Sequence, residues 1–85
     1  MEQISYTIKD EAGIHARPAG LIVSGAKNFD CKILIKLSEK TADAKGLFSI
    51  MGLAAKKGDT IQMEFCGSDE IAAKGYFENF LPKYL

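Results

Sequence analysis

The sequence predicts an α+β protein, an open-faced β-sandwich in which a four-stranded, mainly antiparallel sheet carries three helices on one face. Four short segments alternate apolar and polar residues, as half-buried strands do. Three other segments repeat apolar residues at helical spacing, and the two kinds follow the order β-α-β-β-α-β-α. Because each strand has a single apolar face, we expect the helices to cover that face and to leave the other to water.

The first half of the chain predicts a strand over residues 4–8 and a helix over about 16–27. A polar loop that ends in Gly13 separates them. Pro18 marks the first helical turn, because a proline at that position loses no helical hydrogen bond. The residues expected to face the core are Ile4, Tyr6 and Ile8 of the strand and Ala19, Ile22, Val23, Ala26 and Phe29 of the helix.

The remaining strands are expected over residues 31–37, 41–43 and 60–66, with a turn at 38–40 between the first two. In both longer strands every second residue is apolar and points to one face, and most of the residues between them are polar. The residues expected to point inward are Cys31, Ile33, Ile35, Leu37, Ile61, Met63 and Phe65.

Two further helices complete the prediction. A short helix begins near Gly46, and a last helix follows Asp69, which is a suitable N-cap, and ends with the help of Pro82. Glu70 suits the positive end of the last helix dipole. The apolar positions expected in the core are Leu47, Ile50, Leu53 and Ala54 in the first of them and Ala73, Phe77, Phe80 and Leu81 in the second.

Length and composition narrow the classes of function. A chain of 85 residues has room for one domain, over 1–85, with a thin core and no deep active-site cavity. Eleven basic residues balance eleven acidic ones, which argues against a nucleic-acid binder. The segment that starts Met1-Glu2-Gln3 does not resemble a secretory signal, and no apolar run could insert into a membrane, so we expect a cytoplasmic protein.

The cysteine pattern argues against a metal site. Cys31 and Cys66 form no Cys-x-x-Cys pair, and a single histidine cannot complete a His/Cys zinc set. Since both lie in apolar strands, we expect two buried or half-buried thiols; a single disulfide is the alternative that the count of two allows. No metal and no cofactor is expected.

The residues around the only histidine have an arrangement that suits phosphate. Gly13 allows a sharp turn, and Pro18 places His15 at or just before the start of the helix. The first-turn N–H groups have no helical acceptor and bind anions, and the Arg17 guanidinium can pair with phosphate oxygens. The segment therefore suits a phosphohistidine, although a lone histidine at a helix start is more often a surface or capping residue.

This segment closely resembles the signature of the HPr family, the histidine-containing phosphocarriers of the bacterial sugar phosphotransferase system. The matching strings are Gly13-Ile14-His15-Ala16-Arg17-Pro18-Ala19, Lys40-Thr41, Ala44-Lys45-Gly46-Leu47-Phe48-Ser49-Ile50-Met51-Gly52-Leu53 and Lys57-Gly58-Asp59.

The resemblance implies that phosphorylated enzyme I transfers a phosphoryl group to Nδ1 of His15, which delivers it to sugar-specific IIA proteins or domains. Arg17 would pair with the phosphate, assisted by the N–H groups of Ala16 and Arg17. On this basis the chain is a carrier rather than an enzyme.

The resemblance also bears on regulation. Many relatives carry a regulatory serine, phosphorylated by an HPr kinase, at the start of the second helix, where this chain has Gly46. The usual switch should therefore be absent, which makes HPr kinase a doubtful partner. Ser49 follows three residues later, within the same local Ser-Ile-Met-Gly string, and is a substitute acceptor or an ordinary surface serine.

Phe48 and Met51 lie outside the predicted core face of the short helix. Exposed Phe and Met are typical of partner surfaces, although apolar residues are more often buried. Because the family docks partners through its first two helices, we expect binding through Gly20, Leu21, Leu47, Phe48 and Met51.

We expect a monomer. There are two alternative hypotheses to a carrier for sugar uptake. The chain is then an HPr-like regulatory phosphorelay protein or a small ligand-binding regulatory domain.

Overall fold

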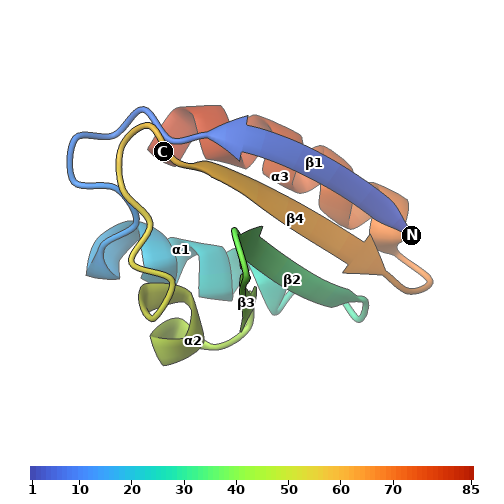
Figure 1. The fold of residues 1–85 in the computed structure, drawn as a ribbon. Helices are drawn as coiled ribbons and strands as arrows, with labels where there is room; N and C mark the ends of the chain where they lie inside the picture. The colour runs from blue at the N-terminus through green and yellow to red at the C-terminus, as the bar shows by residue number, and fades with distance from the viewer.

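The computed structural model describes residues 1–85 and contains one four-stranded sheet with the strand order β1-β4-β2-β3 (Figure 1). Every neighbouring pair is antiparallel, which confirms the predicted sheet. The strands are β1 (Glu2–Thr7), β2 (Lys32–Leu37), β3 (Lys40–Asp43) and β4 (Thr60–Cys66).

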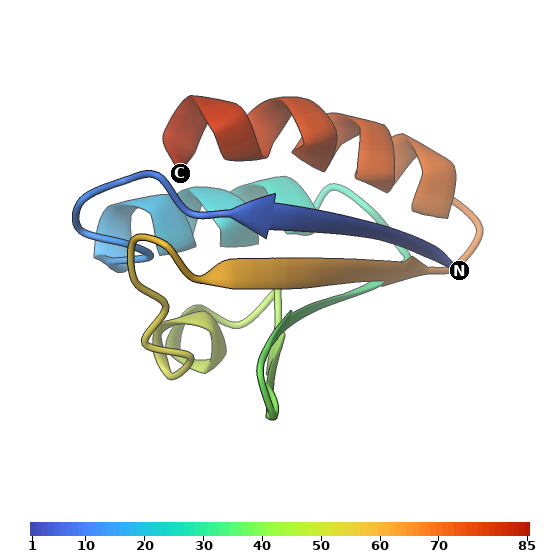
Figure 2. The same ribbon diagram turned by 45° about the horizontal axis from the view of Figure 1, so that its top comes forward.

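The three helices are α1 (Ala16–Ala26), α2 (Leu47–Met51) and α3 (Glu70–Tyr84). In Figure 2, α3 lies along one side of the sheet above β1 and β4, with α1 beside it. The short α2 contacts α1 and β3. The order β-α-β-β-α-β-α and the open-faced arrangement are thus as predicted.

A single cluster of 21 buried residues forms the core between the sheet and the helices. The inward faces predicted for β2 and β4 are confirmed: Ile33, Ile35, Ile61, Met63 and Phe65 are all completely buried. The opposite face of the sheet is mostly polar, although it includes the half-buried Leu34. There the Gln62 amide donates to Gln3 Oε1 at 2.8 Å, and Lys36 pairs with Glu64 at 3.0 Å.

Two core assignments and one expectation of a buried thiol were wrong. Leu47 is 37% exposed, and Ala54 is exposed at φ +51° in the turn after α2, because a helix of five residues can direct few side chains inward. Ile50 and Leu53 are buried as expected. Cys66 is exposed rather than buried, since the alternation of β4 points Phe65 into the core and the next residue out.

The two residues predicted to begin and end α3, Asp69 and Pro82, do not act as expected. Asp69 occupies the N-cap position, but its carboxylate makes no cap hydrogen bond and instead accepts from the N–H groups of Asp30 and Cys31 at 2.8 and 2.9 Å. Pro82 does not end the helix, which continues to Tyr84. The burial of Leu81 and Leu85 favours this continuation, because the last helical turn brings both into the core.

The Asp69 contacts join the start of β2 to the start of α3 and alter two pKa values. The Asp30 N–H, followed by the Cys31 groups, holds the pKa of the Asp69 carboxyl below its ordinary value. Burial, together with the neighbouring Asp69, raises the pKa of the Cys31 thiol to about 11. Cys31 is therefore a neutral core side chain at neutral pH.

Candidate functional site

The loop that leads to His15 is held by main-chain hydrogen bonds to two distant segments. The N–H groups of Lys9 and Asp10 both donate to the Leu85 oxygen at 2.7 Å, at the end of α3. The Ile14 N–H donates to the Ala55 oxygen at 3.0 Å. The position of His15 is therefore set by residues that are far from it in sequence.

Gly13 makes the turn into the site. Its φ is +66°, in the region that favours glycine, and its N–H donates to the Asp10 oxygen at 3.0 Å. The Asp10 carboxylate also accepts from the Ala12 N–H at 2.8 Å, so the main chain and the side chain of Asp10 both stabilise this short turn.

His15 occupies the N-cap position of α1, as the sequence predicts. Its backbone is extended, with φ −102° and ψ −173°, and its oxygen accepts the first helical hydrogen bond from Ala19 at 3.0 Å. The imidazole is exposed and makes no cap hydrogen bond. A ring nitrogen is thus accessible to a group presented by another molecule.

The start of α1 supplies hydrogen-bond donors beside this ring. Because Ala19 makes the first helical bond and Pro18 has no N–H, the free donors of the first turn belong to Ala16 and Arg17. Both residues are exposed, and the Arg17 guanidinium takes part in none of the four ion pairs. These groups form an anion site next to a nucleophilic nitrogen.

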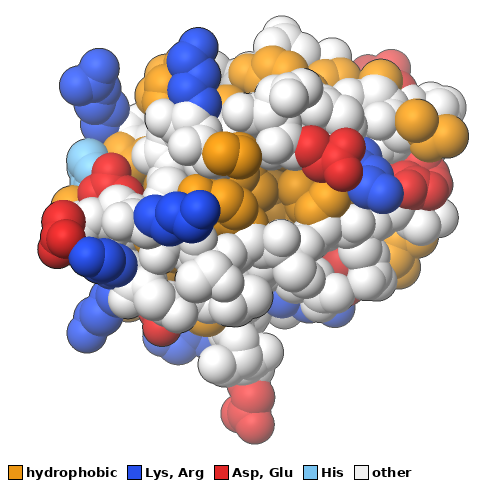
Figure 3. Space-filling view, turned by 90° about the horizontal axis from the view of Figure 1, so that it is seen from above, with side chains coloured by type: hydrophobic (Ala, Val, Ile, Leu, Met, Phe, Trp, Pro, Cys, Tyr) orange, Lys and Arg blue, Asp and Glu red, His pale blue; other side chains and the backbone are white.

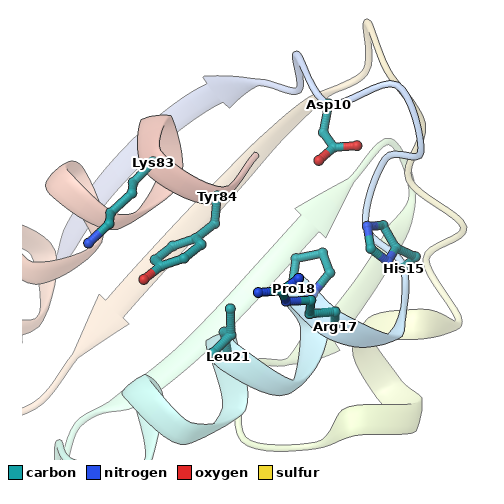
Figure 4. A pocket seen from close by; sticks show the side chains of 7 residues that line it. All are labelled: Asp10, His15, Arg17, Pro18, Leu21, Lys83 and Tyr84. Carbon is teal, nitrogen blue, oxygen red and sulfur yellow. The ribbon is translucent and has the colours of Figure 1, made fainter.

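His15 and Arg17 line a shallow depression of about 200 Å³. Figure 4 shows the Asp10 carboxylate directed into it, the Arg17 guanidinium directed toward the α3 side, and the Tyr84 ring on the opposite wall. Asp10, Lys83 and Tyr84 were not predicted as site residues. The last two line this depression only because α3 folds onto the loop, for which the local sequence contains no signal.

The five residues predicted to bind partners are all accessible and lie on two helices in contact. Leu47 and Met51 are 37% and 38% exposed, and Phe48 is 85% exposed. Gly20 and Leu21 of α1 are half-buried. We call the five residues the α1–α2 patch. Because α1 begins at His15, this patch adjoins the candidate site.

Gly46 is the N-cap of α2 and has an ordinary φ of −119°. A β-carbon there would lie 3.3 Å from Cβ of Ser49. The Ser49 hydroxyl is exposed and accepts a hydrogen bond from the Asp43 N–H at 3.0 Å. Ser49 therefore has a structural contact that fixes the segment before α2.

No group of three or more His, Cys, Asp and Glu side chains is placed to hold a metal ion. None of the three helices has the length and apolar character needed to cross a lipid bilayer.

Comparison with known proteins supports a phosphate-carrying site. Residues 2–82 match the family model described as PTS HPr component phosphorylation site. A phosphocarrier protein HPr of Treponema pallidum is 38% identical over 71 residues, which cover 84% of this chain and 81% of the relative.

Solved structures are similar over nearly the whole chain. A histidine-containing phosphocarrier protein from Mycoplasma has a TM-score of 0.93 at 29% identity and covers 96% of this chain and 93% of its own. An HPr dimer from Thermoanaerobacter tengcongensis has a TM-score of 0.77 at 30% identity, with coverages of 98% and 95%.

Proposed function

Because the chain belongs to the HPr family of phosphocarrier proteins, we propose that His15 accepts a phosphoryl group from phosphorylated enzyme I and passes it to sugar-specific IIA proteins or domains. The observation that supports this most directly is the exposed imidazole at the start of α1, beside the donors of Ala16 and Arg17. Residues 1–85 act as one domain in the cytoplasm. The chain is a carrier rather than an enzyme, because each transfer needs a partner.

The proposed transfer is a nucleophilic substitution at phosphorus. The lone pair of His15 Nδ1 forms the new N–P bond, while Nε2 keeps its proton. The bond between phosphorus and the enzyme I group breaks, and its electron pair stays with that group. Onward transfer reverses these roles, with a nucleophile of the IIA partner attacking phosphorus and the imidazole leaving.

Arg17 and the first-turn N–H groups stabilise the charge on the phosphoryl oxygens. The N–H donors of Ala16 and Arg17 are fixed by the helix and need no rearrangement during transfer. The Arg17 guanidinium supplies charge-assisted hydrogen bonds and is unpaired in the free protein.

Partner docking is proposed to use the α1–α2 patch. Enzyme I and the IIA acceptors must both reach His15, so their footprints on this patch overlap and they bind one at a time. The three exposed apolar side chains of α2 provide the apolar centre of such an interface.

The experiment is incubation of the chain with labelled phosphoenolpyruvate and enzyme I, followed by analysis of the labelled protein. We expect acid-labile, base-stable phosphate that is absent from His15→Ala and unchanged in Thr41→Ala, an exposed β3 residue. If active enzyme I leaves the wild-type chain unlabelled, the result favours the alternative hypothesis of a ligand-binding regulatory domain. Onward transfer to a sugar-specific IIA domain, and not to a nitrogen-related one, separates uptake from the regulatory phosphorelay.

Ser49 is retained as a candidate second phosphorylation position because its hydroxyl is exposed. The Asp43 carboxylate opposes a new negative charge there, whereas the Asp43 N–H, which donates to the Ser49 hydroxyl, is able to donate to a phosphate oxygen instead. Treatment with HPr kinase, with Ser49→Ala as the control, tests this: phosphate incorporation that is unchanged in the variant excludes Ser49.

A further inference from the structure

The strand β1 is a free sheet edge whose only charged residue, Glu2, lies at one end. It pairs only with β4, in an unbroken register of six residue pairs from Glu2↔Phe65 to Thr7↔Thr60. Its sequence contains neither lysine nor proline, which many edge strands use to prevent further pairing. The other edge strand, β3, has only four residues and begins with Lys40. Every second residue of β1 therefore presents its N–H and C=O away from the sheet.

A groove of about 410 Å³ runs beside this free edge, between β1 and α3. Figure 3 shows hydrophobic side chains gathered in a band across the middle of this face, with acidic and basic side chains toward its right end. The residues that line the groove and that the argument uses are Ile4, Tyr6, Lys74, Phe77 and Glu78. A strand added to β1 would direct alternate side chains into this groove.

One residue that lines the groove carries a buried polar group with no partner. The Tyr6 hydroxyl is the one buried side-chain oxygen or nitrogen that makes no hydrogen bond, and Tyr6 lines the groove. A buried hydroxyl without a partner is costly to the free protein. Because no surface of this hydroxyl is open to solvent, a molecule bound in the groove contacts the rest of the Tyr6 side chain and not the hydroxyl.

Charge at the groove favours a basic occupant. Lys74 is paired with Glu2 at 3.2 Å, whereas Glu78 on the same helix takes part in no ion pair and is exposed. Because the Glu2–Lys74 pair is neutral as a whole, Glu78 gives this part of the surface a net negative charge.

We propose that this edge binds an extended segment of a partner protein, which adds to β1 as a fifth strand. The segment alternates apolar and polar residues, places its apolar side chains between β1 and α3, and carries a basic residue opposite Glu78. Main-chain hydrogen bonds supply the affinity, and the groove supplies the specificity.

This surface lies apart from the α1–α2 patch, since β1 and α3 are on the other side of α1 from α2 (Figure 1). A segment bound along β1 leaves His15 accessible. The chain could thus be tethered to one protein while it exchanges a phosphoryl group with another.

The probe is a synthetic peptide of alternating valine and threonine with a terminal arginine, titrated into the full isotopically labelled chain and followed by NMR. We expect shifts confined to β1 and the groove side of α3, with a dissociation constant of about 1 mM or tighter. A peptide of the same sequence with alternate amides N-methylated should not bind, because it cannot pair with the edge.

Three variants test which residues of the groove contribute to peptide binding. Tyr6→Phe should leave binding unchanged because the hydroxyl is not accessible, while its thermal midpoint equals or exceeds that of the wild type because an unpartnered buried hydroxyl is removed. Glu78→Gln should weaken binding at low salt. Glu39→Gln, which makes the same charge change at the exposed β2–β3 turn, should leave it unchanged.

Absence of binding, equal binding of the N-methylated peptide, or shifts centred on α2 would each overturn the proposal. So would concentration-dependent dimerisation of the chain alone that protects the β1 amides, because the edge would then belong to a second copy.

Discussion

Gly13 and Ala55 lie main chain against main chain, so that a β-carbon at Gly13 would overlap the Ala55 oxygen and lie 2.8 Å from Cα of Lys56. The same oxygen accepts the hydrogen bond from Ile14 that precedes His15. This contact joins the turn after α2 to the loop that carries the histidine. Glycine is the one residue type that satisfies both the positive φ and the lack of space.

Gly13→Ala should therefore destabilise the protein and disturb the site together. The positive φ alone costs about 1–3 kcal/mol, and the overlap with Ala55 adds to this. Chemical denaturation measures the loss, and labelling by enzyme I under conditions where the variant is folded measures the effect on His15. Gly58→Ala is a useful control, since Gly58 has φ +92° but open space around it. Equal effects of the two variants on labelling would contradict a specific role for the Gly13 contact.

Arg17→Ala should slow phosphoryl transfer without unfolding the protein. The loss of a charge-assisted hydrogen bond to phosphate, about 1.5–3 kcal/mol, corresponds to a decrease of about ten- to a hundredfold in kcat/KM for the transfer from enzyme I. The thermal midpoint should stay unchanged because Arg17 is exposed and outside the ion pairs. Lys27→Ala, which removes an exposed charge just beyond α1, should keep the wild-type rate.

Phe48→Ser should weaken partner binding and leave stability nearly unchanged. The side chain is 85% exposed, so the free energy of unfolding should change by no more than about 0.5 kcal/mol. At the centre of an interface the same truncation costs about 2 kcal/mol or more, which is a loss of affinity of about thirtyfold. Ile71→Ser is the matched control, because Ile71 is 74% exposed on α3, outside the α1–α2 patch. Calorimetric titration with enzyme I measures both, and equal losses would exclude a specific role for Phe48.

The two cysteines should differ in reactivity. Cys66 is exposed, whereas Cys31 is buried and has a pKa raised to about 11, so almost no thiolate is present there at neutral pH. A colourless thiol reagent that releases a dye should label one thiol in the native protein and two in denaturant. Cys66→Ser should abolish the native reaction, and rapid labelling of that variant would show that Cys31 is open to solvent.

Asp69→Asn should lower stability in a pH-dependent manner. Hydrogen bonds from Asp30 and Cys31 depress the pKa of Asp69 in the folded state, so the ionised carboxylate stabilises the fold. This contribution is fully present above the unfolded value of about 3.9 and is lost as the pH falls through the lower folded pKa. The difference in thermal midpoint between wild type and variant should thus be largest near neutral pH and shrink in acid. Asp30→Asn, whose side chain accepts none of these bonds, should show no such trend.

The strands and longer helices could be predicted from the sequence because their apolar periodicity reflects burial directly. Ile33, Ile35, Ile61 and Phe65 each stand at the alternate position that the sheet buries. Errors arose where tertiary contacts outweigh local signals. Asp69 is a good cap residue, but the neighbouring start of β2 offers it two donors, and the buried Leu85 favours a helical turn beyond Pro82.

The candidate site likewise has one part that the sequence predicts and another that it does not. The position of His15 at the start of α1 follows from Pro18 and Gly13, which lie next to it in sequence. Tyr84 and Lys83 line the same depression, but their approach depends on the hydrogen bonds from Lys9 and Asp10 to Leu85. No periodicity or spacing in the chain encodes a contact across so many residues.

The two hydrogen bonds to Leu85 have a consequence for the order of events during protein synthesis. His15 leaves the ribosome early, yet the loop before it is fully held only after the last turn of α3 has been translated and has docked. A nascent chain that lacks α3 therefore displays the histidine without its final geometry. We therefore expect a chain that is truncated before α3 to accept a phosphoryl group from enzyme I more slowly than the full chain does.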